Sequence, residues 1–136
     1  MIWYRIPIRP VTKKNSQQII KSKGRPMIIP SAQYRKYEKD AGCYLIPSEP
    51  PIAYPINVKC TYYFHPNKDG SIPKKNPDLV NLIEATNDIL VKHRIVADDN
   101  CTIIVSHDGS SVIYDSIHDE GTEIEISEKE IPFRTD

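Results

Sequence analysis

The stretch Ile56-Asn57-Val58-Lys59-Cys60-Thr61-Tyr62-Tyr63-Phe64 alternates between apolar and mostly polar side chains along its length. Because successive side chains of a strand point to opposite faces, one face collects Ile56, Val58, Cys60, Tyr62 and Phe64. This alternation makes residues 56–64 the clearest strand in the chain. It predicts a sheet whose apolar face is directed at a core.

Weaker patterns on both sides predict the other elements. Alternation predicts strands at residues 2–8, 101–106, 111–117 and 122–127, the last as a solvated strand leading into an acidic terminus. Asp108-Gly109 lies between two of these strands and is a hairpin signal. Apolar side chains at helical spacing predict helices over about residues 31–45, beginning at Ser31, and 78–92. The basic segment 9–30 is expected to form a mobile loop or a loose hairpin.

These elements predict one α+β domain over residues 1–136, with a mixed or antiparallel sheet packed against two helices. The 136 residues are 39% hydrophobic and 26% charged, which is typical of a globular protein. No apolar run is long enough to span a membrane, and no signal peptide is recognisable. The three cysteines, Cys43, Cys60 and Cys101, are odd in number and lack a Cys-x-x-Cys pair. They are expected to be small buried residues in a reducing cytoplasm.

The net charge of zero conceals an unequal distribution. Residues 1–75 carry 14 Lys and Arg against 4 Asp and Glu, and residues 76–136 carry 4 against 14. This asymmetry favours a polyanion-binding half, although the two halves could equally attract each other within the fold. The candidate DNA-binding residues are Lys13, Lys14, Lys21, Lys23, Arg25, Lys74 and Lys75. The alternative for the loop lysines is an ordinary solvated surface.

Carboxylates gather around the second helix. Asp78 stands at its start, and Asp98 and Asp99 stand together before the next strand. Val80 falls among the polar residues of this helix, one turn before Glu84, where a carboxylate would fit the pattern better. Oxygen ligands of this kind bind Mg²⁺, which activates water and stabilises leaving oxygens of a phosphodiester. The alternative is a helix cap at Asp78 followed later by a solvated Asp98-Asp99 turn.

The order and spacing of these residues resemble a known family. Pro77-Asp78-x-x-Asn81-Leu82, Asp88-x-Leu90 and Ile95-x-x-Asp98-Asp99 resemble the signature of the RusA-like Holliday-junction resolvases. Upstream, Pro10-Val11-Thr12-Lys13-Lys14-Asn15-Ser16 and Tyr34-Arg35-Lys36-Tyr37-Glu38 are similar to that family's basic loop and following helix. The resemblance covers about residues 5–105.

The resemblance implies a small homodimeric, Mg²⁺-dependent endonuclease, often encoded in phages and prophages, that cuts four-way DNA junctions by paired nicks. It implies that Asp78 and Asp99 bind metal, with Asp98 beside them. Apolar side chains of the N-terminal and central strands are expected to contribute to the dimer interface.

The sequence departs from the family pattern at two positions. Val80 stands where the family has a second Asp, and Glu84 stands where it has a catalytic Lys. In one interpretation Glu84 replaces the lost carboxylate, so that the catalytic residues are Asp78, Asp99 and Glu84, with Asp98 added in the metal site. In the other, the protein is catalytically weakened and binds branched DNA without cutting it.

Overall fold

The computed structural model describes residues 1–13 and 17–135, and it contains a five-stranded mixed sheet. β1 (Ile2–Ile6) and β4 (Ile56–Phe64) flank β7 (Gly121–Glu128), and both run antiparallel to it. β5 (Ile104–Ser106) and β6 (Ser111–Tyr114) run parallel to β4 along its other edge. The predicted α+β class with a mixed sheet is confirmed, and the predicted strand 56–64 has the bounds of β4.

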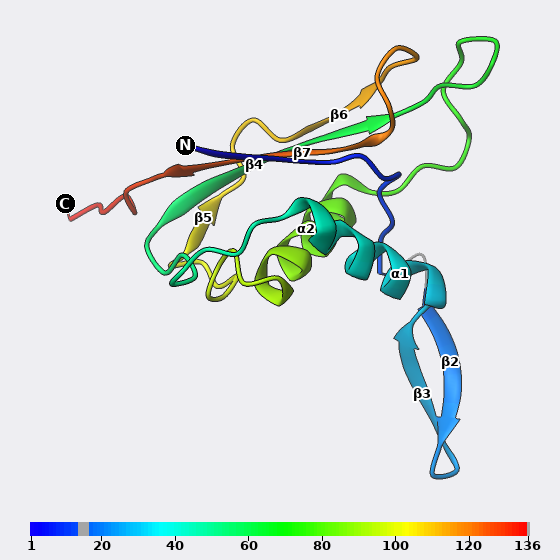
Figure 1. Cartoon of the computed structure of the whole chain (residues 1–136), viewed down its shortest axis with the longest axis horizontal. Coiled ribbons are helices and arrows are strands. Elements are labelled where there is room, and N and C mark those ends of the chain that lie inside the picture. The colour runs from blue at the N-terminus through cyan, green and yellow to red at the C-terminus, as the bar shows by residue number, and fades with distance from the viewer. Residues whose placement is uncertain (14–16, 136) are drawn as a thin grey trace.

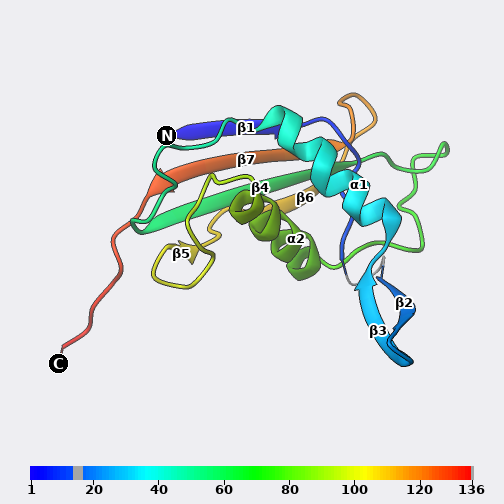
Figure 2. The same cartoon turned by 60° about the horizontal axis from the view of Figure 1, so that its bottom comes forward.

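Two helices lie side by side on one face of this sheet (Figure 2). They are α1 (Ala32–Ala41), which a short 3₁₀ turn at Gly42–Tyr44 follows, and α2 (Leu79–Lys92). Ser31 begins α1 as predicted, because its side chain accepts a hydrogen bond from the Tyr34 amide at 3.1 Å. Where α2 meets β4, the hydroxyl oxygens of Tyr62 and Thr86 are 2.7 Å apart.

The core lies between the helices and β4. Its members from β4 are no more than 2% exposed, and they are Ile56, Val58, Cys60, Tyr62 and Phe64. Their burial removes them from any dimer interface, so the expectation that the central strand contributes apolar side chains to one is wrong. Only Cys60 of the cysteines is buried; Cys43 and Cys101 are exposed, contrary to expectation.

The predicted hairpin at Asp108-Gly109 is wrong. β5 and β6 do not pair with each other; they follow one another along the same edge of β4. Between them, side chains replace the missing strand bonds: His107 Nδ1 lies 2.8 Å from the Val58 carbonyl oxygen, and Ser110 Oγ accepts from the Cys60 amide at 2.9 Å. The edge of β4 therefore stays hydrogen-bonded across the break, which lets both strands stay parallel to it.

The acidic C-terminal segment also departs from expectation. Residues 121–128 form β7, which lies between β1 and β4 rather than at a solvated edge. Thr122, Ile124 and Ile126 are at most 2% exposed on its inner side. On the other side Glu123 pairs with Arg5 at 3.7 Å, and Glu125 pairs with Lys59 at 3.3 Å. The two halves of opposite charge therefore do meet within the fold, on the sheet face that the helices leave open.

A separate two-stranded ribbon completes the fold. β2 (Gln17–Ser22) and β3 (Arg25–Pro30) pair antiparallel and project from the end of α1, away from the sheet (Figure 1). This agrees with the loose hairpin expected within residues 9–30. In the part of the chain that the structure describes, no helix is long and apolar enough to cross a membrane.

Candidate active site

Asp78 immediately precedes α2, and the helix does not use its carboxylate. Its backbone is extended (φ −75°, ψ 139°), as at an N-cap, yet its side chain makes no capping hydrogen bond to the described helix. The residue is exposed. The reading of Asp78 as an ordinary helix cap therefore loses its support, and the carboxylate is available to a ligand at a helix end whose dipole favours anions.

Two exposed lysines precede Asp78 in a loop that is fastened to the sheet. Asn76 donates to the Pro73 carbonyl at 2.6 Å and accepts from the Tyr114 hydroxyl of β6. This anchor holds Lys74 and Lys75 beside the N-terminus of α2, where both cations and the helix amides attract phosphate. Sequence reasoning missed the anchor, because nothing in the local pattern links Asn76 to a tyrosine 38 residues later.

Asp98 and Asp99 follow the other end of α2. Arg94 has a positive φ of 62° and turns the chain, and Val96 then pairs with Ile52 in an isolated bridge. Asp98 accepts hydrogen bonds from Asn100 Nδ2 at 2.7 Å and from the Asp99 amide at 2.8 Å, which lower the pKa of its carboxyl. Asp98 thus holds the turn, and the exposed Asp99 is the better candidate ligand.

The length of α2 separates the two candidate ligands. Its 14 residues, at about 1.5 Å each, extend about 21 Å. The loop before α2 is bonded to Tyr114 beside the C-terminal end of β4, whereas the segment after Asp99 meets the N-terminal end of β4. Asp78 and Asp99 therefore lie toward opposite ends of α2. Among residues 1–13 and 17–135, no three His, Cys, Asp or Glu side chains are grouped to hold a metal ion. Within the described part of one chain, Asp78 and Asp99 are therefore too far apart to bind the same metal ion.

Val80 and Glu84 lie on the outer face of α2. Both are exposed, and Val80 is 73% exposed, so the apolar residue does face solvent as its place in the helical pattern predicts. Residues four apart on a helix are neighbours, so the carboxylate at 84 lies one turn from the position where one is missing. Any change at these two positions acts on the surface of α2 and leaves its buried side untouched.

The predicted DNA-binding cations differ in how freely the fold presents them. Lys13 donates to Asp88 Oδ2 at 3.0 Å and lies 5.8 Å from the Tyr34 ring. This hydrogen bond to Asp88 is the main cause of the raised pKa of Lys13. Lys23 and Arg25 are exposed at the tip of the ribbon, as are Lys74 and Lys75 before α2. Lys21 belongs to β2, and Lys14 lies outside the described residues.

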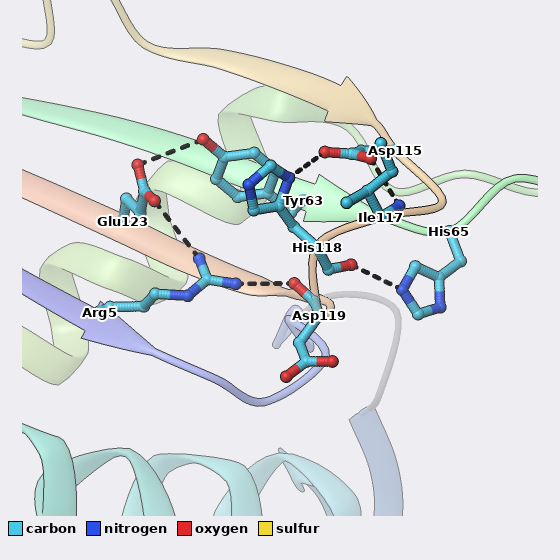
Figure 3. Close-up of polar contacts among 8 residues, drawn as sticks. All are labelled: Arg5, Tyr63, His65, Asp115, Ile117, His118, Asp119 and Glu123. Carbon is cyan, nitrogen blue, oxygen red and sulfur yellow. Dashed lines mark hydrogen bonds and ion pairs between the residues drawn. The ribbon is translucent and has the colours of Figure 1, made fainter.

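A polar cluster on the open face of the sheet is distinct from these residues (Figure 3). Arg5 donates to the Asp119 carbonyl at 2.7 Å, and Tyr63 donates to Glu123 at 3.2 Å. His118 pairs with Asp115, whose pKa this contact lowers, and the His118 carbonyl oxygen lies 2.8 Å from His65 Nε2. The cluster fastens the loop between β6 and β7 to the sheet, which is a structural role.

Comparison with known families supports the resemblance seen in the sequence. A family model described as endodeoxyribonuclease RusA matches residues 7–127. No curated protein matches the chain at a significant level. The matched span includes the ribbon, the loop before α2, α2 itself and the Asp98-Asp99 turn, so it covers every candidate residue described above.

Proposed function

The chain belongs to the RusA endodeoxyribonuclease family, whose nucleases act on Holliday junctions and generally depend on a divalent metal ion. From this premise we propose that it resolves four-way DNA junctions by paired nicks with Mg²⁺ as cofactor. The observation that carries the proposal is the exposed carboxylate at each end of α2, at Asp78 and Asp99, on positions that match the family's motif. We place the reaction in the reducing cytoplasm as part of this proposal, which the three free cysteines support.

The separation of Asp78 from Asp99 supports a homodimer in which each site is shared. A two-fold axis across the middle of α2 lays two copies of the helix antiparallel. Asp78 of one protomer then lies beside Asp99 of the partner subunit, and the same contact recurs on the other side of the axis. The surface of α2 offers apolar side chains for such a contact at Leu79, which is 36% exposed, and at the partly buried Ile83. Two equivalent sites suit a reaction that needs two nicks.

The roles of the residues follow from their chemistry. Asp78 and Asp99 bind the metal, Asp98 orients Asp99 through its turn, and Glu84 supplies a further carboxylate in place of the one missing at Val80. A bound Mg²⁺ would lower the pKa of a water molecule and would neutralise negative charge on phosphate oxygens. Lys74 and Lys75 hold the phosphate backbone beside Asp78. They also provide the positive charge that the family Lys would have given at position 84.

The second candidate function is binding without cleavage. It is favoured by Val80, which is exposed as Asp78 is. A carboxylate at this position could bind metal together with Asp78, whereas valine has no oxygen ligand to offer. In this reading the basic residues still bind branched DNA, and the metal site has lost a ligand.

A cleavage assay separates these two functions. A four-way junction with a label on each strand is expected to give symmetric nicks in two opposing strands with Mg²⁺, and no product in EDTA. A linear duplex of the same sequence is the control and stays uncut. A junction that is bound in preference to the duplex but remains intact at every Mg²⁺ concentration would establish the binding-only function. Equal binding of both DNAs would contradict both functions.

Replacement of Lys74 and Lys75 by Ala tests their phosphate contacts. We expect affinity to fall for junction and duplex alike, because these cations contact the backbone rather than the bases. The plot of log affinity against log salt should become less steep by about two units, roughly one for each lost phosphate contact. Binding titrations at several salt concentrations measure the slope. An unchanged slope would mean that the two lysines only solubilise the loop.

A further inference from the structure

The strands β2 and β3 form a two-stranded sheet of their own and pair with no described strand of the main sheet. This ribbon extends from the body of the protein with its tip far from the sheet (Figures 1 and 2), and α1 is its nearest neighbouring element. Its six residue pairs, at about 3.4 Å per residue, give it a reach of about 20 Å. An isolated two-stranded ribbon is marginally stable in water. A ribbon of this shape is therefore expected to act on a partner outside the chain.

The tip is a tight turn with an unusual residue. Ser22 pairs with Arg25, so the loop consists of Lys23 (φ 52°) and Gly24 (φ 76°), both in the left-handed region. This is the pattern of a type I′ turn, in which Asn-Gly is strongly preferred at these two positions. Gly24 adopts it without penalty, whereas a lysine there opposes the usual preference. The turn therefore presents a cation at its apex where Asn would stabilise the ribbon better.

The charge of the ribbon identifies the kind of partner. Residues 17–30 contain Lys21, Lys23 and Arg25 and no acidic residue, and the first acidic residue of the whole chain is Glu38. Lys23 and Arg25 are exposed on either side of Gly24. The partner is therefore a polyanion, and DNA is the polyanion on which the family acts.

We propose that the tip of this ribbon enters the major groove of a junction arm, where Lys23 and Arg25 contact guanine edges. The inference rests on the proposed function and adds base contacts to it. The major groove, about 12 Å wide, admits a two-stranded ribbon, whereas the minor groove is about half as wide. Arg and Lys are the usual partners of guanine O6 and N7. The turn places Lys23 at the apex and Arg25 directly after Gly24, so both exposed cations lie at the end of the ribbon that would enter the groove.

Methylation interference tests the proposal on the full-length protein and a junction in EDTA, so that no cleavage occurs. Dimethyl sulfate methylates guanine N7 in the major groove and adenine N3 in the minor groove. For the parent protein we expect interference at guanine N7 in one arm. Arg25→Gln should remove part of this signal and weaken binding to that junction roughly ten-fold.

Lys23→Asn makes the test independent of folding, because Asn suits the left-handed turn better than Lys does. We expect it to lose guanine interference while the ribbon remains intact. Lys23→Arg should retain the interference. Arg134→Gln removes one exposed charge from the C-terminal segment and should leave the pattern unchanged.

Three results would overturn the inference. Guanine interference that is identical in the parent, in Arg25→Gln and in Lys23→Asn would show that the tip does not contact guanine in the groove. Interference at adenine N3 in place of guanine N7 would place the tip in the minor groove. Interference by phosphate ethylation alone would mean that the tip contacts only the DNA backbone. In each case a parent that still cleaves junctions leaves the proposed function intact. A parent that does not bind the junction contradicts both.

Discussion

Protein carrying Asp78→Asn and protein carrying Asp99→Asn should each fail to cut a four-way junction, and a mixture of the two should regain cleavage. Each substitution removes a carboxylate charge while retaining the size of the side chain. Both residues are exposed, so neither change disturbs the core. We expect each single variant to lose at least about 10²-fold in cleavage rate, the scale on which loss of one stabilising group acts.

Recovery in the mixture follows from the geometry of α2. If each site takes Asp78 from one protomer and Asp99 from the partner subunit, a mixed dimer places both substitutions in one site and leaves the other site native. Half of the dimers are mixed after random exchange, and each has one native site, so about one quarter of the nicking capacity returns. The product should be a junction nicked on one strand, because the second site of the same dimer is inactive.

Two controls make the complementation test decisive. A mixture of Asp78→Asn with the Asp78→Asn, Asp99→Asn double variant contains no native site and should stay inactive. Light scattering should report twice the 15.6 kDa of the chain. If the first mixture also stays inactive although subunits have exchanged, each site lies within one chain. If light scattering gives the mass of a single chain at micromolar protein concentration, the proposed dimer is contradicted.

The sequence predicts the positions of strands and helices better than it predicts which strands pair with each other. The alternation of residues 56–64 and the helical spacing after Asp78 are local signals, and β4 and α2 appear at the expected positions. Strand pairing is not local. The Asp108-Gly109 turn signal predicts a hairpin, whereas the contacts of His107 and Ser110 with β4 hold both strands parallel to it. Those contacts link residues about 50 positions apart and leave no mark on the local pattern.

The same distinction applies to the candidate site. Sequence spacing identifies Asp78 and Asp99 as residues of metal-binding type, and their role in catalysis stays a prediction. Spacing predicts the helix between them, but it cannot show that the chain after α2 stays at the far end of the helix instead of returning to Asp78. Nor can it show that Asp98 is engaged in its own turn, with hydrogen bonds to Asn100 and to the Asp99 amide. These facts depend on three-dimensional placement, and they are why we propose a site shared by two chains instead of a site within one chain.

Glu84→Ala should abolish Mg²⁺-dependent cleavage and leave junction binding intact, if Glu84 replaces the carboxylate missing at Val80. The two positions are one helical turn apart, with Cβ atoms about 6 Å from each other, and Glu has a longer side chain than Asp. Val80→Ala is the matched control, because it changes the same outer face of α2 without removing a charge. It should cleave like the parent. Cleavage of the junction and binding to it are measured in parallel for each variant.

The reverse design distinguishes compensation from loss of activity. Val80→Asp combined with Glu84→Lys restores the family pattern and should raise the cleavage rate, since it returns both a carboxylate and a cation to that face. Both side chains are exposed, so the double variant should fold as the parent does. Compensation is wrong if Glu84→Ala cleaves as fast as the parent. It is also wrong if the parent cleaves no junction while the double variant does. That second result would mean that the protein still binds DNA but lacks, at Val80, the carboxylate that cleavage requires.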